Sequence, residues 1–204
     1  MFGISLLLFC KNDDKIQRLL LSHPFRIFVL YIQTMKTILY LHGLHSHLSN
    51  EKYEVLKQYG NVKAPEFDYA TTPDVIARLI KQFEGDNIDY VMGSSMGGFV
   101  GYYVAQALGV PALLFNPALP YRSVEQQVPP IKKVHTAPVH FVLGVKDEVV
   151  RAKDTLQLIT EKMPTAAQYR IHLRPELGHR IPMPVFQEEV WRFFNVKTPL
   201  FLKE

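Results

Sequence analysis

Short runs of apolar residues recur along the chain from residue 37 onward, and longer segments with helical spacing separate them. The first run, Thr37–Leu41, is almost entirely apolar, as is typical of a strand that is buried on both faces of a sheet. Further strands are predicted at Val62–Phe67, from Ile88 to the glycine at position 93, and at Ala112–Phe115, Val139–Leu143 and Gln168–Leu173.

The segments between these runs have the apolar spacing of helices. Helices are predicted at Asn50–Gln58, from Thr72 to the end of the apolar face at Phe83, at Phe99–Leu108, at Arg151–Lys162, and around Phe186, Val190 and Phe193. Thr72 is expected to be the hydroxyl cap of its helix, because a proline and an acidic residue follow it. Strands that alternate with helices indicate the α/β class, with a mostly parallel, doubly wound sheet and helices on both faces.

The composition is that of an ordinary globular protein. The chain has 204 residues, of which 48% are hydrophobic and 21% charged. Its net charge is +4, but it contains no arginine-rich run, RNA-binding signature or zinc spacing, so nucleic-acid binding is disfavoured. Cys10 is the single cysteine, which excludes an internal disulfide and fits a reducing compartment.

Residues 1–34 differ in pattern from the rest of the chain. Two apolar runs, Ile4–Cys10 and Phe25–Ile32, flank a charged stretch, and neither reaches the roughly 20 residues that a membrane span needs. A signal peptide is disfavoured because no basic region precedes the first run. We expect Met35 to be the natural start, with residues 1–34 as an N-terminal extension outside the core and 35–204 as the folded domain. The alternative is an added helix or strand at the sheet edge.

Candidate chemistry begins with the pentapeptide Gly-Ser-Ser-Met-Gly at Gly93–Gly97. It has the form G-x-S-x-G and lies between a strand pattern and a helix pattern, which is the context of a nucleophile elbow. The spacing selects Ser95 rather than Ser94 as the nucleophile, and a serine hydroxyl needs a base to remove its proton. The same pentapeptide also occurs in turns that bind phosphate or only reverse the chain, so the other residues of the site must decide.

A loop rich in histidine, His42–His47, follows the first strand. A His-Gly pair at this position contributes to the oxyanion hole of related elbow enzymes, where fixed N–H groups stabilise the negative charge on the attacked carbonyl oxygen. The candidate donors are the backbone amides of Leu44 and Met96. A zinc site at His45 and His47 is disfavoured because no acidic residue lies nearby, and we expect no metal.

An acidic and a basic partner for the serine follow in chain order. Asp147 lies in the turn after a late strand, where an orienting carboxylate is expected, and it is preferred over Glu148 and Asp154. His179 follows the last strand next to a glycine and is the candidate base. The order serine, aspartate, histidine is that of α/β-hydrolases. Two further histidines, His140 and His172, lie within predicted strands and are interpreted as core or surface residues.

The segment Asn116–Thr136 has no clear periodicity and contains four prolines. In this topology it would lie over the carboxyl edge of the sheet and form a short lid on a shallow pocket. Arg122, within this segment, could meet an anionic substrate group, but a solvated surface arginine is the more common outcome.

From about Met35 to Asn195 the chain resembles a compact member of the α/β-hydrolase superfamily, and in particular the small bacterial YqiA-type esterases. The sequences that carry the resemblance are Ile38–Gly43, Gly93–Gly98, Gly144–Val150 and the Gly-His pair ending at His179. The resemblance implies a cytoplasmic carboxylesterase or thioesterase with a preference for short acyl groups and no cofactor. The chain departs from the family in its histidine-rich loop, where small polar residues are more usual.

These patterns together predict a serine hydrolase that cleaves small acyl esters through an acyl-enzyme, with Ser95, Asp147 and His179 as the triad. The alternatives are a thioesterase or a C–C bond hydrolase on the same triad, because fold and triad do not choose among these reactions. A non-catalytic binding protein that keeps the fold is a further alternative. The expected partner is a small acyl ester or thioester, without nucleic acid or stable membrane insertion, and the sequence leaves the oligomeric state open.

Overall fold

The computed structural model describes residues 35–131, 136–163 and 168–195. The chain divides into two units, Met1–Met35 and Lys36–Glu204, and the predicted N-terminal extension lies outside the described residues. The described residues form one six-stranded sheet in the order β2-β1-β3-β4-β5-β6, and every neighbouring pair is parallel. Its strands are β1 (Thr37–Leu41), β2 (Asn61–Lys63), β3 (Tyr90–Ser94), β4 (Ala112–Phe115), β5 (Val139–Gly144) and β6 (Tyr169–Arg174).

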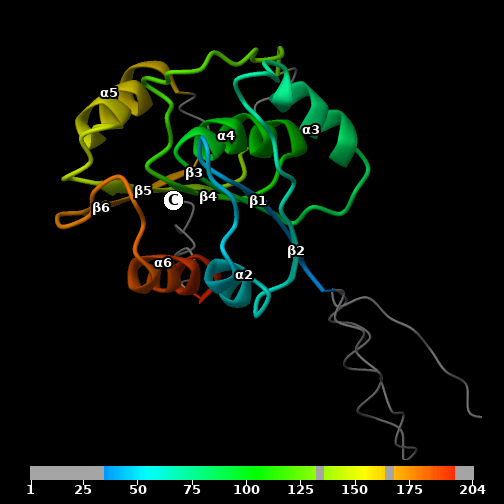
Figure 1. Ribbon diagram of the computed structural model, residues 1–204, viewed down its shortest axis with the longest axis horizontal. Helices are drawn as coiled ribbons and strands as arrows, with labels where there is room; N and C mark the ends of the chain where they lie inside the picture. Colours follow the sequence, from blue (N-terminus) through cyan, green and yellow to red (C-terminus); the bar gives the residue numbers. More distant parts are fainter. Residues whose placement is uncertain (1–34, 132–135, 164–167, 196–204) are drawn as a thin grey trace, which may run out of the picture. The chain divides into compact units, whose positions relative to one another are not determined.

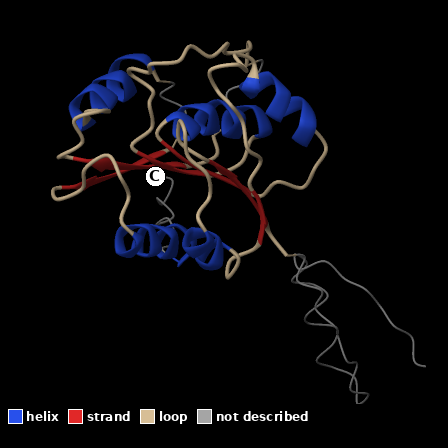
Figure 2. Cartoon of the chain, viewed as in Figure 1, coloured by secondary structure: helices blue, strands red, loops and turns tan. Residues whose placement is uncertain are grey.

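Helices cover both faces of the sheet (Figures 1 and 2). The described helices are α2 (Asn50–Leu56), α3 (Val75–Phe83), α4 (Met96–Leu108), α5 (Ala152–Lys162) and α6 (Met183–Asn195). In Figure 1, α3, α4 and α5 lie above the sheet, and α2 and α6 lie below it. The doubly wound α/β architecture expected from the alternating pattern is therefore present.

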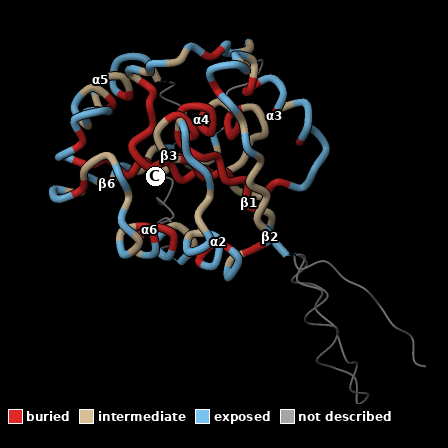
Figure 3. The backbone as a smooth tube through the Cα atoms, viewed as in Figure 1, coloured by how far each residue is buried: buried red, intermediate tan, exposed pale blue. Residues whose placement is uncertain are grey.

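The hydrophobic core has one layer on each side of the sheet. Leu39 and Leu41 of β1 pack toward the layer that includes α3 and α4, whereas Ile38 and Tyr40 pack toward α2 and α6. Neighbouring side chains of a strand point to opposite faces, so a strand between two layers must be apolar throughout. Figure 3 shows the resulting band of buried backbone through the central strands.

The order of the strands places a crevice between β1 and β3. The chain adds β2 on one side of β1 and then returns to place β3 on the other side, so the loops after β1 and β3 leave in different directions. Ligands of open α/β sheets bind at such a switch point, beyond the carboxyl ends of the strands. The candidate nucleophile follows β3, and the histidine-rich loop follows β1.

The largest differences from the predicted boundaries are in β2, α3 and α4. The strand expected at Val62–Phe67 is β2, which spans only Asn61–Lys63. Thr72 is not the cap of α3, because the helix begins at Val75 and Asp74 is its N-cap residue. The Asp74 carboxylate makes no capping hydrogen bond and accepts a hydrogen bond from Arg78 Nε at 2.9 Å. Helix α4 begins at Met96, directly after Ser95 and three residues before the predicted start.

Candidate active site

Ser95 lies at a sharp bend between β3 and α4. Its φ of 53° and ψ of −118° are rare for a residue other than glycine, and such a conformation costs roughly 1–3 kcal/mol. Backbone hydrogen bonds hold the bend, because Ser95 N–H donates to Phe115 O at 2.9 Å and Ser95 O accepts from Phe99 N at 3.0 Å and from Ala118 N at 2.9 Å. The bend leaves the Ser95 hydroxyl at the edge of two cavities.

The glycines of the pentapeptide allow β3, α4 and the end of β1 to approach closely. A Cβ at Gly93 would overlap the Gly97 carbonyl group. A Cβ at Gly97 would overlap the carbonyl oxygens of Leu41 and His42. Both obstacles are backbone atoms, which cannot move aside as a flexible side chain could. The pattern G-x-S-x-G is therefore a packing requirement of this crossing.

The structure brings Ser95, His179 and Asp147 together in one line of contacts. His179 Nε2 lies 3.1 Å from Ser95 Oγ, and His179 Nδ1 lies 2.8 Å from Asp147 Oδ2. The other carboxylate oxygen, Asp147 Oδ1, accepts hydrogen bonds from Val149 N and Val150 N, each at 2.8 Å. These contacts join the turns after β3, β5 and β6 at the carboxyl edge of the sheet.

The contacts also fix the tautomer of His179. A carboxylate accepts hydrogen bonds only, so Asp147 assigns the ring proton to Nδ1. Nε2 is then free to accept a proton from the Ser95 hydroxyl. The arrangement can therefore activate a serine oxygen for nucleophilic attack.

The rival residues lie elsewhere. The Ser94 hydroxyl interacts with the Tyr40 phenol, whereas His179 Nε2 contacts the hydroxyl of Ser95. Glu148 is exposed, and Asp154 forms an ion pair with Arg151 at 2.7 Å, whereas Asp147 is only 3% exposed. Burial and backbone donors thus favour Asp147 as the partner of His179.

His42 holds the loop after β1 in place. Phe67 N–H donates to His42 Nε2 at 3.1 Å, so the ring proton is assigned to Nδ1, which donates to Gly43 O at 2.7 Å. The Gly43 carbonyl and the Leu44 N–H belong to one planar peptide group and point in opposite directions. The buried His42 ring therefore orients the Leu44 amide, and both of its nitrogens already have partners.

Metal binding gains no support from the loop. Among the described residues, no group of three or more histidine, cysteine or acidic side chains could hold a metal ion. His45 and His47 are exposed. Within the same residues, no helix combines the length and apolar character needed to cross a membrane.

Asn116 is a site residue that the sequence analysis did not single out. Its side-chain oxygen accepts from Gly144 N at 2.7 Å, and its amide nitrogen donates to Gly178 O at 2.9 Å and to His179 O at 3.3 Å. The residue is 2% exposed and has a φ of 40°, which asparagine tolerates better than most residues. One side chain therefore links the turn of Asp147 to the loop of His179.

Asn116→Asp tests this link. Aspartate keeps an acceptor for Gly144 N but has no N–H to donate to the carbonyl groups of Gly178 and His179. We expect kcat for a small ester to fall about 10²-fold through misplacement of His179. The matched control, Asn195→Asp, changes an exposed asparagine at the end of α6 and should leave kcat unchanged. Equal kcat values for the two variants would contradict the role of Asn116.

Two cavities meet at Ser95 and His179. The Lys52 cavity has a volume of about 440 Å³ and is lined also by Leu44, His45, Ser46, Lys52, Arg180 and Ile181. The Arg122 cavity has a volume of about 230 Å³ and is lined also by Leu44, Met96, Ala118, Tyr121, Arg122 and Val150. These volumes suit a small molecule divided between two arms.

The segment after β4 forms one wall of the Arg122 cavity, as its predicted position over the sheet edge suggested. Gln126 donates to Tyr69 O at 2.8 Å and to Thr72 O at 3.1 Å, which ties the segment to the loop before α3. The expectation of a solvated Arg122 was wrong. Its guanidinium is half-buried and lies 4.2 Å from the centroid of the Phe99 ring, because the tied segment turns this side chain inward.

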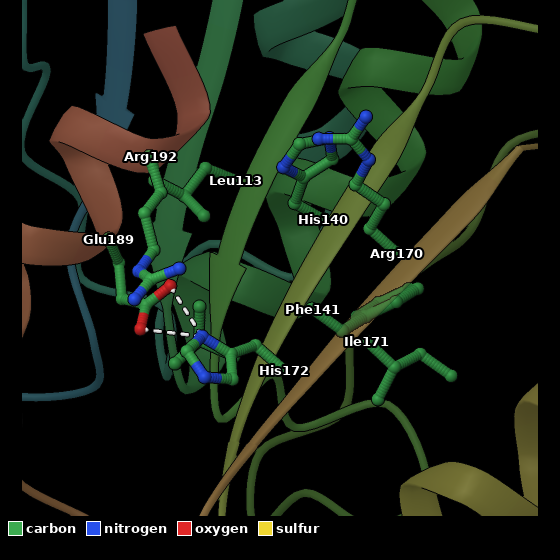
Figure 4. A pocket seen from close by; sticks show the side chains of 9 residues that line it. Leu113, His140, Phe141, Arg170, Ile171, His172, Glu189 and Arg192 are labelled. Carbon is green, nitrogen blue, oxygen red and sulfur yellow. Dashed lines mark hydrogen bonds and ion pairs between the residues drawn. The ribbon is translucent and has the colours of Figure 1, made fainter. Parts of the chain in front are cut away.

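A third cavity, of about 230 Å³, lies between β5, β6 and α6 (Figure 4). It holds His140 and His172, the two strand histidines. His172 Nδ1 pairs with Glu189 Oε1 at 2.8 Å, and the His140 ring packs edge-on against Phe193 with centroids 5.0 Å apart. Among the described residues that line it there is no serine, threonine or cysteine, so it lacks a hydroxyl or thiol nucleophile.

His140 makes the stability of the fold depend on pH. Burial, with a smaller contribution from Arg170, lowers the pKa of His140 from 6.5 to about 4. The unfolded chain therefore takes up this proton at a higher pH than the folded chain, and acidification between these values favours unfolding. We expect the free energy of unfolding to fall from pH 7 to pH 4.5 in denaturant titrations, and His140→Gln to reduce that fall. His47→Gln, an exposed control, should leave the fall unchanged; an equal effect of both variants would contradict this origin.

The family of the chain follows from a comparison with family models. The model described as "Uncharacterised protein family (UPF0227)" matches residues 37–168. The chain belongs to this family. UPF0227 is the YqiA family, so the resemblance inferred from the sequence is confirmed.

Several solved structures resemble this chain in fold at low sequence identity. A protein of the alpha/beta hydrolase superfamily from Xanthomonas campestris pv. campestris has a TM-score of 0.58 at 16% identity, over 79% of this chain and 98% of its own. Est1E from Butyrivibrio proteoclasticus has a TM-score of 0.60 at 16% identity, over 78% and 86%. Acyl-protein thioesterase 2 from Zea mays has a TM-score of 0.55 at 17% identity, over 79% and 93%. The fold is therefore the α/β-hydrolase fold, as predicted.

Proposed function

We propose that this chain is a serine hydrolase that cleaves small acyl esters, with Ser95, His179 and Asp147 as its catalytic residues. The observation that carries the proposal is the unbroken line of contacts from Ser95 Oγ through the His179 ring to the buried Asp147 carboxylate. The line opens onto two cavities that can hold the two halves of an ester. We propose a carboxylesterase-type reaction, of the EC 3.1 class, for this arrangement.

The proposed reaction has two halves. His179 Nε2 takes the proton of the Ser95 hydroxyl while Oγ attacks the acyl carbonyl carbon, and the same imidazolium then protonates the departing alkoxide. A water molecule attacks the resulting acyl-enzyme by the same route, which releases the carboxylic acid and restores Ser95. Asp147 holds the Nδ1–H tautomer and stabilises the positive ring throughout.

The amides of Met96 and Leu44 are the proposed oxyanion donors. Met96 is the first residue of α4, so its N–H has no acceptor within the helix and lies at the positive end of the helix dipole. Leu44 lines both cavities, and the hydrogen bond from His42 to Gly43 O orients its peptide group. Fixed donors of this kind act where negative charge develops on the carbonyl oxygen.

The proposed steps use only side chains and backbone amides of the chain and water, so the proposal includes no cofactor. It also includes a cytoplasmic location, which the single cysteine favours. The same catalytic residues would serve a thioester, and an acyl chain-length series of paired esters and thioesters would separate these substrates.

Labelling with a fluorophosphonate probe tests the proposal against a non-catalytic binding protein. We expect mass spectrometry to locate the adduct on Ser95 and to find none in Ser95→Ala. Ser94→Ala is the matched control, since it removes the neighbouring hydroxyl and should still be labelled. A folded wild-type protein that resists the probe, or an adduct on Ser94, would show that the proposal is wrong.

A further inference from the structure

The surroundings of Ser95 are positively charged. Among the described residues that line the Lys52 and Arg122 cavities, none is acidic, whereas Lys52, Arg122 and Arg180 are cationic. Asp147 is buried and pairs with His179 Nδ1, so its carboxylate does not face either cavity. A neutral ester would bring no anionic group to these cations.

Arg122 differs from most arginines of the described chain. Arg78, Arg151, Arg174 and Arg192 each pair with a carboxylate, but within the described residues Arg122 has no such pair. Its Nε is buried and has no hydrogen-bond acceptor in the same part of the chain. The side chain is nevertheless held in place, because its guanidinium rests on the Phe99 ring at 4.2 Å.

Such a guanidinium is prepared for a carboxylate. Stacking on an aromatic ring fixes the plane of the group while leaving its in-plane N–H donors available. Arginine binds carboxylates with two parallel hydrogen bonds, and partial burial strengthens these bonds because less water competes. The Arg122 cavity also contains Ser95 and His179, so a group bound there belongs to a molecule that can react at Ser95.

We propose that the substrate is a small ester that carries a carboxylate, and that Arg122 binds this carboxylate in the Arg122 cavity while Ser95 attacks the ester carbonyl. The inference rests on the proposed hydrolase function and adds the charge of the substrate to it. The cavity of about 230 Å³ suits a short carboxylate-bearing arm rather than a long chain. Arg122 is thus assigned as the residue that determines specificity.

Lys52 and the exposed Arg180 line the other cavity and are the competing cations, and Lys52 serves as the internal comparison. The ammonium group of Lys52 lies 5.2 Å from the centroid of the Phe186 ring. The Lys52 side chain lines the Lys52 cavity and not the Arg122 cavity. An ammonium is a point charge without the planar fork of a guanidinium, so we assign the carboxylate to Arg122. Variants of both residues can decide between the two cavities.

Two matched pairs of substrates test the inference through kcat/KM. The first pair is mono-4-nitrophenyl succinate and its neutral methyl ester, which differ in charge on the acyl side. The second is 4-butyryloxybenzoate and its methyl ester, which differ in charge on the leaving-group side. In at least one pair we expect the wild-type protein to prefer the anionic member by about 10–100-fold, which is the range of a charged hydrogen bond. The pair that shows the preference identifies the half of the substrate that carries the carboxylate.

The preference should depend on Arg122. Arg122→Met should reduce the anionic-to-neutral ratio to near one, Arg122→Lys should restore part of it, and Lys52→Met should retain it. Arg78→Met, an exposed arginine on α3 outside both cavities, should leave both rates unchanged. Continued turnover of the neutral esters shows that each variant is folded.

The possible failures are distinct. If the wild-type protein hydrolyses the neutral esters without preferring the anionic ones, or if Arg122→Met keeps the preference, the inference is wrong and the hydrolase function stands. Loss of the preference in Lys52→Met alone would move the carboxylate to the other cavity and also overturn the assignment to Arg122. If no ester is hydrolysed and Ser95 is not labelled, the proposed function itself fails.

Discussion

Replacement of Ser95 by alanine is expected to lower kcat for 4-nitrophenyl butyrate by about 10⁴–10⁶-fold. The substitution removes the oxygen that lies 3.1 Å from His179 Nε2, so no acyl-enzyme can form. Steady-state release of 4-nitrophenol measures the loss. The melting temperature should not fall with it, since the hydroxyl faces a cavity rather than the core.

Ser94→Ala is the control for this measurement. It removes a hydroxyl one residue away that interacts with Tyr40 rather than with His179. We expect its kcat to stay within about tenfold of the wild-type value, because truncation of a group outside the reacting atoms costs about 1 kcal/mol. Wild-type turnover in Ser95→Ala would refute the assignment of the nucleophile.

Asp147→Asn should lower kcat by about 10⁴-fold, the size of the loss when a triad histidine is held in the wrong tautomer. The amide oxygen of asparagine must take the place of Oδ1, because Val149 N–H and Val150 N–H both need an acceptor there. The NH₂ group would then face His179 Nδ1 and force the ring proton onto Nε2. A protonated Nε2 cannot accept the proton of Ser95.

Glu148→Gln is the matched control, because it makes the same chemical change at the adjacent, exposed acid. Its kcat should be close to that of the wild-type protein. The contrast between the two variants is measured with one ester at a single pH. Similar rates for Asp147→Asn and Glu148→Gln would remove Asp147 from the mechanism.

Much of this architecture could be predicted because, in a parallel sheet, local sequence patterns determine where distant residues lie. Runs such as Thr37–Leu41 are apolar throughout only where both faces are buried, and their carboxyl ends share one edge. Residues that follow different strands therefore meet, although 84 positions separate Ser95 from His179. Chain order and strand ends were sufficient to select the three side chains that the structure brings together.

Two residues depend on loop geometry: Asn116, which sequence reasoning missed, and Arg122, which it interpreted as a solvated surface residue. Asn116 looks like any polar residue after a strand, and its role arises from a φ of 40° and from three backbone groups in two distant turns. Arg122 looks like a surface residue, and Gln126 and Phe99 decide its place. Such contacts have no periodic signal in the sequence. A conserved asparagine directly after the fourth strand would be the useful signal in related chains.

The unusual backbone of Ser95 also has an evolutionary consequence. A φ of 53° is unstrained for glycine but strained for serine, so serine at this position lowers the stability of the fold. A descendant relieved of selection for turnover would gain stability by drifting to glycine there. Serine at position 95 in a relative would therefore indicate continued selection for catalytic activity, and glycine would indicate that this selection has been lost.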